Sequence, residues 1–156
     1  MERKKLIMPR TSKFKQSLIE WSKNNLTVTP TIYDADTVIR GIYGIFVVDS
    51  DKKCVYVGKS SNIHDRMFNC NNGHITKIKS KKHFIDSLNS GKEIIIEVLE
   101  EVPYQFDDYY KDMQRLASRE NYYIDAYQKN NQCLYQVPEG RHVSLKKWES
   151  WKNPKK

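Results

Sequence analysis

The stretch GIYGIFVVDSDKKCVYVG, residues 41–58, decides the fold of this chain. Its first part, residues 41–48, is short and rich in β-branched and aromatic residues, which is typical of a strand. Five polar residues, 49–53, separate it from a second run of the same kind, residues 54–58. The pattern predicts a β-hairpin.

The two tyrosines of this hairpin can share a face, because successive side chains of a strand point to opposite sides. For each tyrosine taken alone, packing within the strand is the commoner role. In the first strand, alternation places Ile45 and Val47 on the same face as Tyr43. In the second strand, it places Cys54 and Gly58 on the same face as Tyr56.

The segments outside the hairpin predict helices and one further strand. One of residues 60–62 can cap a short helix, and in the next helix Ile78, Ile85 and Leu88 are expected to face the core. This order predicts an α/β fold, a small sandwich in which a three-stranded, mainly antiparallel sheet is flanked by helices and preceded by an N-terminal helix. The predicted elements are helices at about 12–25, after residue 60, at about 76–89 and at about 113–127, and a strand at 93–99.

A chain of 156 residues fits one domain with extensions. We expect a basic N-terminal extension over residues 1–40, a core domain over 41–137 and a basic tail over 138–156. The tail carries Trp148 and Trp151 among its lysines. These rings either stack on exposed bases or, as we favour, dock the tail on the core.

The sequence predicts a cytoplasmic protein without a membrane partner. No apolar run approaches the roughly 18 residues of a membrane-spanning helix, and the N-terminus has no apolar signal core. The three cysteines form no CxxC pair, which argues against a disulfide framework and fits a reducing compartment.

Charge is unevenly distributed along the chain. Lys and Arg number 27 against 19 Asp and Glu, a net charge of +8 that favours a polyanionic partner such as nucleic acid. Residues 52–92 hold nine basic and two acidic residues (+7), whereas residues 93–125 hold three and nine (−6). A nucleic-acid-facing side and plain solvated surface explain this pattern about equally well.

Glu120 is the strongest anomaly of the last predicted helix. A carboxylate on an apolar helix face is costly to bury unless a cation pairs with it. From this helix alone, Arg115 or Arg119 is the simpler partner, and a metal ion is the other. The stripe around Glu120 is otherwise apolar and consists of Leu116, Ala117, Tyr123, Ile124 and Tyr127.

Four features in this order resemble the signature of GIY-YIG nucleases: Gly41-Ile42-Tyr43, Tyr56-Val57-Gly58, Arg66 and Glu120. The resemblance runs from Gly41 to about Gln136 and looks closest to the catalytic domains of phage intron homing endonucleases. Two further stretches support that nearer kinship, namely EEVPY at residues 100–104 and RENYYI at residues 119–124.

The resemblance implies metal-dependent hydrolysis of double-stranded DNA. Glu120 would hold Mg²⁺, for which Mn²⁺ substitutes, and no small-molecule cofactor is implied. Tyr43, helped by Tyr56, would take a proton from the attacking water, and Arg66 would stabilise the charged transition state. A phenol has a pKa of about 10, so either cationic neighbours stabilise its ionised form or the tyrosines only position the water.

The other site residues match the family less closely. His74 corresponds best to a histidine that homing-type members use near the attacking water, and His83 is the competing candidate. Cys70 with these two histidines could also be drawn as a zinc site, which is a weak signal at such loose spacing. Gln136 stands where the family has an asparagine, and its amide is displaced by a methylene.

Basic residues near the site are expected to contact DNA. Lys59 would touch a phosphate oxygen directly. The other expected DNA contacts are Lys77, Lys79, Lys81, Lys82 and His83.

Taken together, we expect an active DNA endonuclease of a phage or a bacterium that serves homing, restriction or attack on competitor DNA. One centre per chain implies nicking, or a homodimer for double-strand cuts. A catalytically weakened member that binds DNA, motivated by Gln136, is the alternative. A third reading is an unrelated basic interaction protein with chance motifs.

Overall fold

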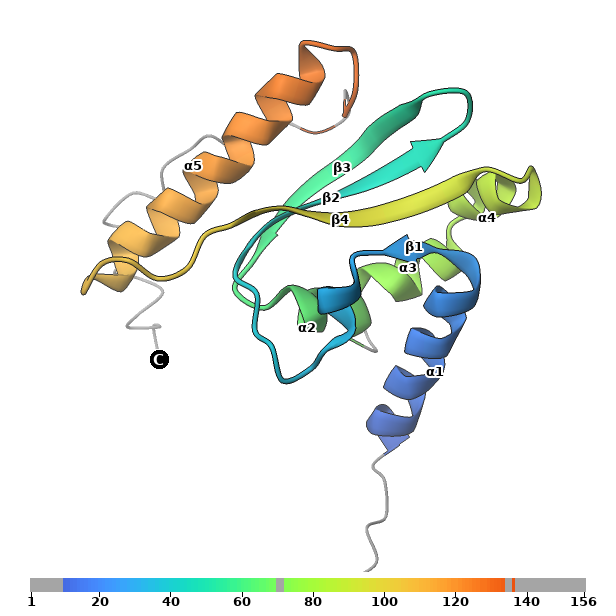
Figure 1. The fold of residues 1–156 in the computed structure, drawn as a ribbon, viewed down its shortest axis with the longest axis horizontal. Helices are drawn as coiled ribbons and strands as arrows, with labels where there is room; N and C mark the ends of the chain where they lie inside the picture. Colours follow the sequence, from blue (N-terminus) through green and yellow to red (C-terminus); the bar gives the residue numbers. More distant parts are fainter. Residues whose placement is uncertain (1–9, 70–71, 134–135, 137–156) are drawn as a thin grey trace, which may run out of the picture.

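The computed structural model describes residues 10–69, 72–133 and 136. Cys70 and the predicted tail with Trp148 and Trp151 lie outside these residues. The elements follow one another in this order (Figure 1): α1 (Arg10–Asn25), β1 (Thr27–Val28), the 3₁₀ turn η1 (Pro30–Tyr33), β2 (Gly41–Val48), β3 (Lys52–Ser60), α2 (Ile63–Phe68), α3 (His74–Ser80), α4 (Lys82–Asn89), β4 (Glu93–Glu101) and α5 (Tyr109–Gln128).

The predicted mixed α/β fold is confirmed, with one strand more than expected. In the described part of the chain the sheet has four strands in the order β1-β4-β2-β3, antiparallel except for β1, which pairs parallel to β4. The additional strand is only two residues long, too short for a hydrophobic pattern to reveal it. In this order the hairpin strand β3 lies at an edge of the sheet.

The β2–β3 hairpin contains a bulge that the sequence did not reveal. Ile45 pairs with Tyr56 but the next residue, Phe46, pairs with Cys54, so Val55 is the extra residue of β3. The bulge reverses the alternation between Cys54 and Tyr56. The prediction that these two share a face is therefore wrong: Cys54 packs in the core on the α5 side, and Tyr56 packs on the opposite side.

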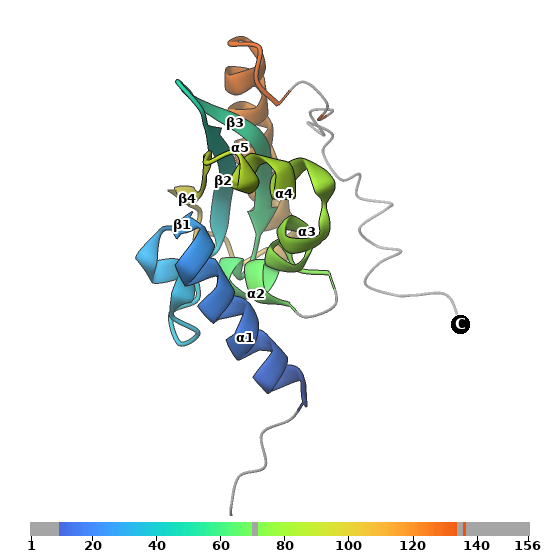
Figure 2. The ribbon, with the colours of Figure 1, turned by 90° about the vertical axis from the view of Figure 1, so that its right-hand side faces the viewer.

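Two hydrophobic cores cover the two faces of the sheet. One core brings α1, α2 and α3 against Tyr43, Ile45 and β4, and the other packs α5 against β2 and β3. Figures 1 and 2 show this sandwich from two directions, with α5 on one side of the sheet and α1–α4 on the other. In the described part of the chain, no helix is long and apolar enough to cross a membrane.

The helix predicted at about 76–89 is two helices. Lys81 has an extended backbone (φ −81°, ψ 129°) and separates α3 from α4. The break changes which side of α4 faces the sheet. Phe84 packs against the core, whereas Ile85, predicted to point inward, is 37% exposed. The prediction extended one helical period across Lys81, and it therefore assigned the wrong face of α4 to the core.

Candidate active site

A cavity of about 530 Å³ brings together most of the predicted catalytic residues. β2 and β3 provide the two tyrosines, α2 provides Arg66 and α5 provides Glu120. The residues that line it are Tyr43, Tyr56, Lys59, Arg66, Glu120, Ile124 and Gln136. The spacing in the sequence was therefore a good guide to proximity in space.

Tyr43 is fully buried and lies across from Gly58 of the neighbouring strand. A Cβ atom at residue 58 would collide with the hydroxyl group and ring of Tyr43, so this position requires glycine. The Tyr43 hydroxyl group is 2.7 Å from Nε2 of His74 at the start of α3. The ring of Tyr56 stands beside both, with its centroid 6.3 Å from that of Tyr43 and 5.0 Å from that of His74.

Burial sets the protonation states of this aromatic cluster. It raises the pKa of Tyr43 well above its ordinary value, and the nearby Arg66 guanidinium offsets this only in part. Burial also lowers the pKa of His74 to about 3, and the positive charges of Arg66, Lys77 and Lys81 act in the same direction. A neutral phenol therefore faces a neutral imidazole at physiological pH, and the expected stabilisation of a phenolate by cations is outweighed.

The two candidate histidines have different surroundings. His74 is buried against Tyr43. His83 is exposed on α4, and its ring packs on that of Phe84 at a centroid distance of 4.9 Å. Within the described residues no group of three His, Cys, Asp or Glu side chains could hold a metal ion, so those residues contain no zinc site. The proposed cluster also included Cys70, which is not described.

Glu120 is 8% exposed, and its carboxylate forms an ion pair with Lys59. The Lys59 ammonium group lies 3.4 Å from Oε1 of Glu120. The arginines expected as simpler partners are engaged elsewhere. Arg119 forms an ion pair with Glu100 at 2.8 Å, and Arg115 donates a hydrogen bond to the Pro103 carbonyl group at 2.7 Å. Lys59 was expected at a phosphate, and nothing in the sequence indicated its contact with Glu120.

Gln136 uses its side-chain amide to hold the outer edge of β3. Its Oε1 accepts a hydrogen bond from the Val57 amide group at 2.7 Å, and its Nε2 donates one to the Val57 carbonyl group at 2.7 Å. Both ends of the amide are thus used on the residue between Tyr56 and Gly58. Among the described residues, no strand pairs with β3 on this side, and the amide takes up hydrogen bonds of its open edge.

The predicted DNA-binding residues of α3 and α4 point in different directions. Lys77, Lys81 and His83 line a second groove beside the cavity. Lys79 instead lies over the ring of Trp21 in α1, 5.5 Å from its centroid, and Lys82 pairs with Asp86 at 2.7 Å.

Comparison with known families identifies the family of this chain. Residues 40–133 match the model of the GIY-YIG catalytic domain. The chain belongs to the GIY-YIG family. No curated protein and no solved structure matches it. Membership makes the chain a nuclease, a phosphodiester hydrolase, and implies a DNA substrate. Members of the GIY-YIG family generally use a divalent metal ion.

The GIY-YIG cavity fits a hard divalent cation such as Mg²⁺. Glu120 presents a carboxylate to the cavity from the apolar face of α5. Mg²⁺ retains several waters and is commonly held by one or two carboxylates together with substrate phosphate, so a single glutamate is an adequate protein ligand. Tyr43 and Tyr56 add hydroxyl groups to the same wall.

The buried, neutral His74 predicts a specific pH dependence of stability. Between about pH 6.5, where an unfolded histidine titrates, and pH 3, the unfolded chain binds one proton more than the folded one. The free energy of unfolding therefore falls as pH falls, by up to about 1.4 kcal/mol per pH unit from this group. His74→Gln should remove that contribution, as measured by urea unfolding in metal-free buffer across this range.

His83→Gln, which removes an exposed imidazole, is the matched control and should follow the wild-type curve. If the wild-type and His74→Gln curves run parallel, His74 is not held in its neutral form by the fold.

Proposed function

We propose that this chain is a metal-dependent DNA endonuclease in which Tyr43, Tyr56, Arg66 and Glu120 form the reaction centre. One observation carries the proposal: these four side chains, from four different elements, line a single cavity. One side of the cavity is cationic and can bind a phosphate, and the tyrosine hydroxyl groups can hydrogen-bond to a water molecule. Such a combination suits hydrolysis of a phosphodiester, in which water attacks phosphorus and negative charge develops on the phosphate oxygens.

Tyr43 and His74 are suited to take the proton of the attacking water. A water O–H would donate its proton to the Tyr43 hydroxyl oxygen as the Tyr43 proton moves to Nε2 of His74. The 2.7 Å contact between those two atoms supports this route. The lowered pKa of His74, about 3, leaves the imidazole neutral but also makes it a weak base. A phosphate bound beside the ring would favour the resulting imidazolium. No preformed phenolate is needed, and Tyr56 positions the water.

Arg66 and Lys59 would bind the phosphate itself. The Arg66 guanidinium group lines the cavity beside the tyrosines, and its planar fork matches two phosphate oxygens. Lys59 is half-buried and sits next to Glu120. Its long side chain can turn from the carboxylate to a phosphate oxygen when DNA binds. Lys77 and Lys81 continue this positive surface beyond the cavity.

Glu120 would hold the divalent cation, with Mg²⁺ as the natural ion and Mn²⁺ as a substitute. A cation there supplies positive charge for the phosphate and for the 3′ oxygen that leaves. In its absence the Lys59 ammonium group, 3.4 Å from Oε1 of Glu120, supplies the balancing charge.

The biological setting is a phage or a bacterium, in homing, restriction or attack on competitor DNA. The stretches at residues 100–104 and 119–124 support kinship with homing enzymes. We place the nuclease domain at residues 41–137, between a basic N-terminal extension and a basic tail, in a cytoplasmic protein. A monomer would nick, and a homodimer would cut both strands.

Cleavage of supercoiled plasmid tests the proposal. The wild-type protein should nick or linearise the plasmid with Mg²⁺ or Mn²⁺ and not with a chelator. Glu120→Gln and Arg66→Ala should each reduce the rate by at least about 100-fold, because each removes charge stabilisation of the transition state. Binding of the same DNA, measured by fluorescence anisotropy, should be largely kept by Glu120→Gln.

Lys92→Ala is the matched control, since this lysine pairs with Asp49 away from the cavity. Metal-independent cutting, or undiminished cutting by both variants, would refute the assignment. Binding without cleavage under either metal would favour the weakened, DNA-binding member instead.

Gln136 decides between a fully active and a weakened enzyme. Gln136→Asn shortens the side chain by a methylene, so the amide no longer reaches both backbone groups of Val57. Because Val57 joins Tyr56 to Gly58, we predict that cleavage falls by between about 10-fold and 100-fold. A sharp rise in the single-turnover rate would instead show that the natural glutamine is a handicap.

A further inference from the structure

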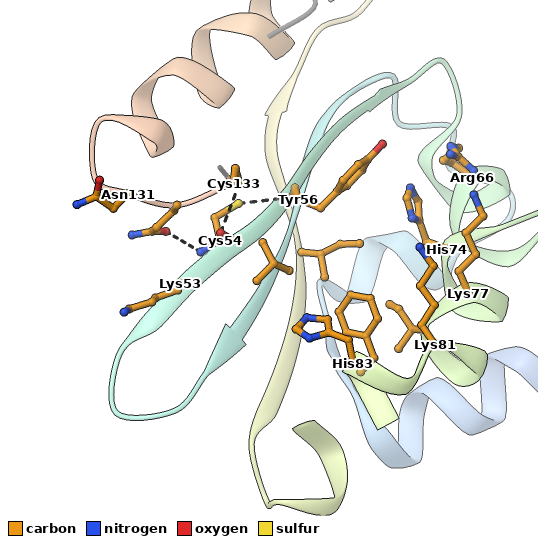
Figure 3. A pocket seen from close by; sticks show the side chains of 15 residues that line it. Lys53, Cys54, Tyr56, Arg66, His74, Lys77, Lys81, His83, Asn131 and Cys133 are labelled. Carbon is orange, nitrogen blue, oxygen red and sulfur yellow. Dashed lines mark hydrogen bonds between the residues drawn. The ribbon is translucent and has the colours of Figure 1, made fainter. Parts of the chain in front are cut away.

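A second groove of about 510 Å³ adjoins the active site and has no role in the reaction described above. It lies between β3 on one side and α3 and α4 on the other (Figure 3). Its volume is within the roughly 300–1,000 Å³ typical of sites that hold small organic molecules. The groove is therefore large enough for a nucleobase with part of its sugar.

The floor of the groove is apolar and partly aromatic. Ile45 and Val55 of the sheet face Ile78 of α3 and Phe84 of α4 across it. Val55 is the bulged residue of β3, and the bulge turns it to this side. His83 continues the aromatic surface through its contact with Phe84. Flat rings of this kind offer a stacking surface to any nucleobase, whatever the DNA sequence.

The rim of the groove is cationic. Lys77 and Lys81 extend along one wall toward Arg66 and His74, while Lys53 stands on the opposite side beside Asn131 (Figure 3). All three lysines are exposed. None of the acidic residues in the described part of the chain lines the groove. Apolar floor and basic rim match a base flanked by backbone phosphates.

The groove is continuous with the reaction centre. Tyr56 and Arg66 line both the cavity and the groove, and His74 lines the groove while bonded to Tyr43. A phosphate held by Arg66 would thus have its neighbouring nucleotide at the entrance of the groove. In a regular duplex that base is stacked and paired, and cannot enter.

We propose that the groove is a subsite for one unpaired nucleobase next to the scissile phosphate. The base stacks on Phe84 and His83, and Lys77 and Lys81 neutralise the phosphates on either side of it. The enzyme then favours DNA in which this nucleotide is already unpaired, as at a mismatch, a flap or a junction, because unpairing costs least there. This subsite rests on the proposed function, since the cleaved phosphate fixes which base can reach it.

The test uses one defined duplex, first cut to map the scissile bond, and then the same duplex with one mismatch scanned across the flanking positions. A mismatch at the subsite position should raise kcat/KM by about tenfold or more over the paired duplex. Val55→Trp, which fills the groove, and Phe84→Ala, which removes the stacking ring, should each bring this ratio close to one. Lys92→Ala is the matched control, because Lys92 pairs with Asp49 and lines neither the cavity nor the groove, and should keep the wild-type ratio.

A binding measurement separates the subsite from catalysis. The Glu120→Gln variant is mixed with the mismatched duplex carrying 2-aminopurine as the unpaired base at the subsite position. The fluorescence of 2-aminopurine reports how the base is stacked. The emission should change on binding, and adding Val55→Trp should abolish the change. The signal requires no cleavage. If no scissile bond can be mapped, 2-aminopurine is scanned across the positions of the duplex, so the subsite is still tested.

Cleavage with a mismatch ratio near one at every position would overturn the subsite and leave the nuclease intact. Binding of the 2-aminopurine duplex without any change in emission would also overturn it, as expected if the chain's own C-terminal tail fills the groove. Absence of both cleavage and binding would refute the proposed function and the subsite together.

Discussion

The pairing of Tyr43 with Gly58 is the constraint on which the rest of the site depends. Residue 58 has no side chain, and the space this leaves is filled by the Tyr43 ring. The ring is thereby held in the core with its hydroxyl group at His74. A shift of the register by one residue would turn the Tyr43 ring to the opposite face of the sheet, away from Gly58 and His74. The position of the phenol is thus set by backbone pairing rather than by a flexible loop.

Several devices reinforce this register. The bulge at Val55 keeps Tyr56 on the face of Tyr43 while Cys54 joins the core under α5. The Gln136 amide then holds the outer edge of β3 at Val57. An edge strand without such contacts is free to fray or to pair with another chain. In this structure Gln136 therefore supports the strand.

The sequence predicted the parts of the site that local pattern controls. The hairpin, the shared face of Tyr43 and Tyr56 and the anomalous Glu120 follow from alternation and helical periodicity. The bulge and the break at Lys81 do not, because each interrupts the period from which the faces are read. The pairing of Lys59 with Glu120 does not either, because it joins residues 61 positions apart. The protonation states of Tyr43 and His74 depend mainly on burial, and the charged residues near them in the sequence do not reveal how deeply each is buried.

In the proposed reaction water, activated at Tyr43, attacks phosphorus while the 3′ oxygen leaves beside Glu120. Mass spectrometry of the ends of one defined duplex, cut by the wild-type protein with Mg²⁺ in ¹⁸O-labelled water, tests this reaction. We expect a 3′-hydroxyl end and a 5′-phosphate carrying one ¹⁸O atom. A 3′-phosphate end, or a 5′-phosphate without the label, would contradict it.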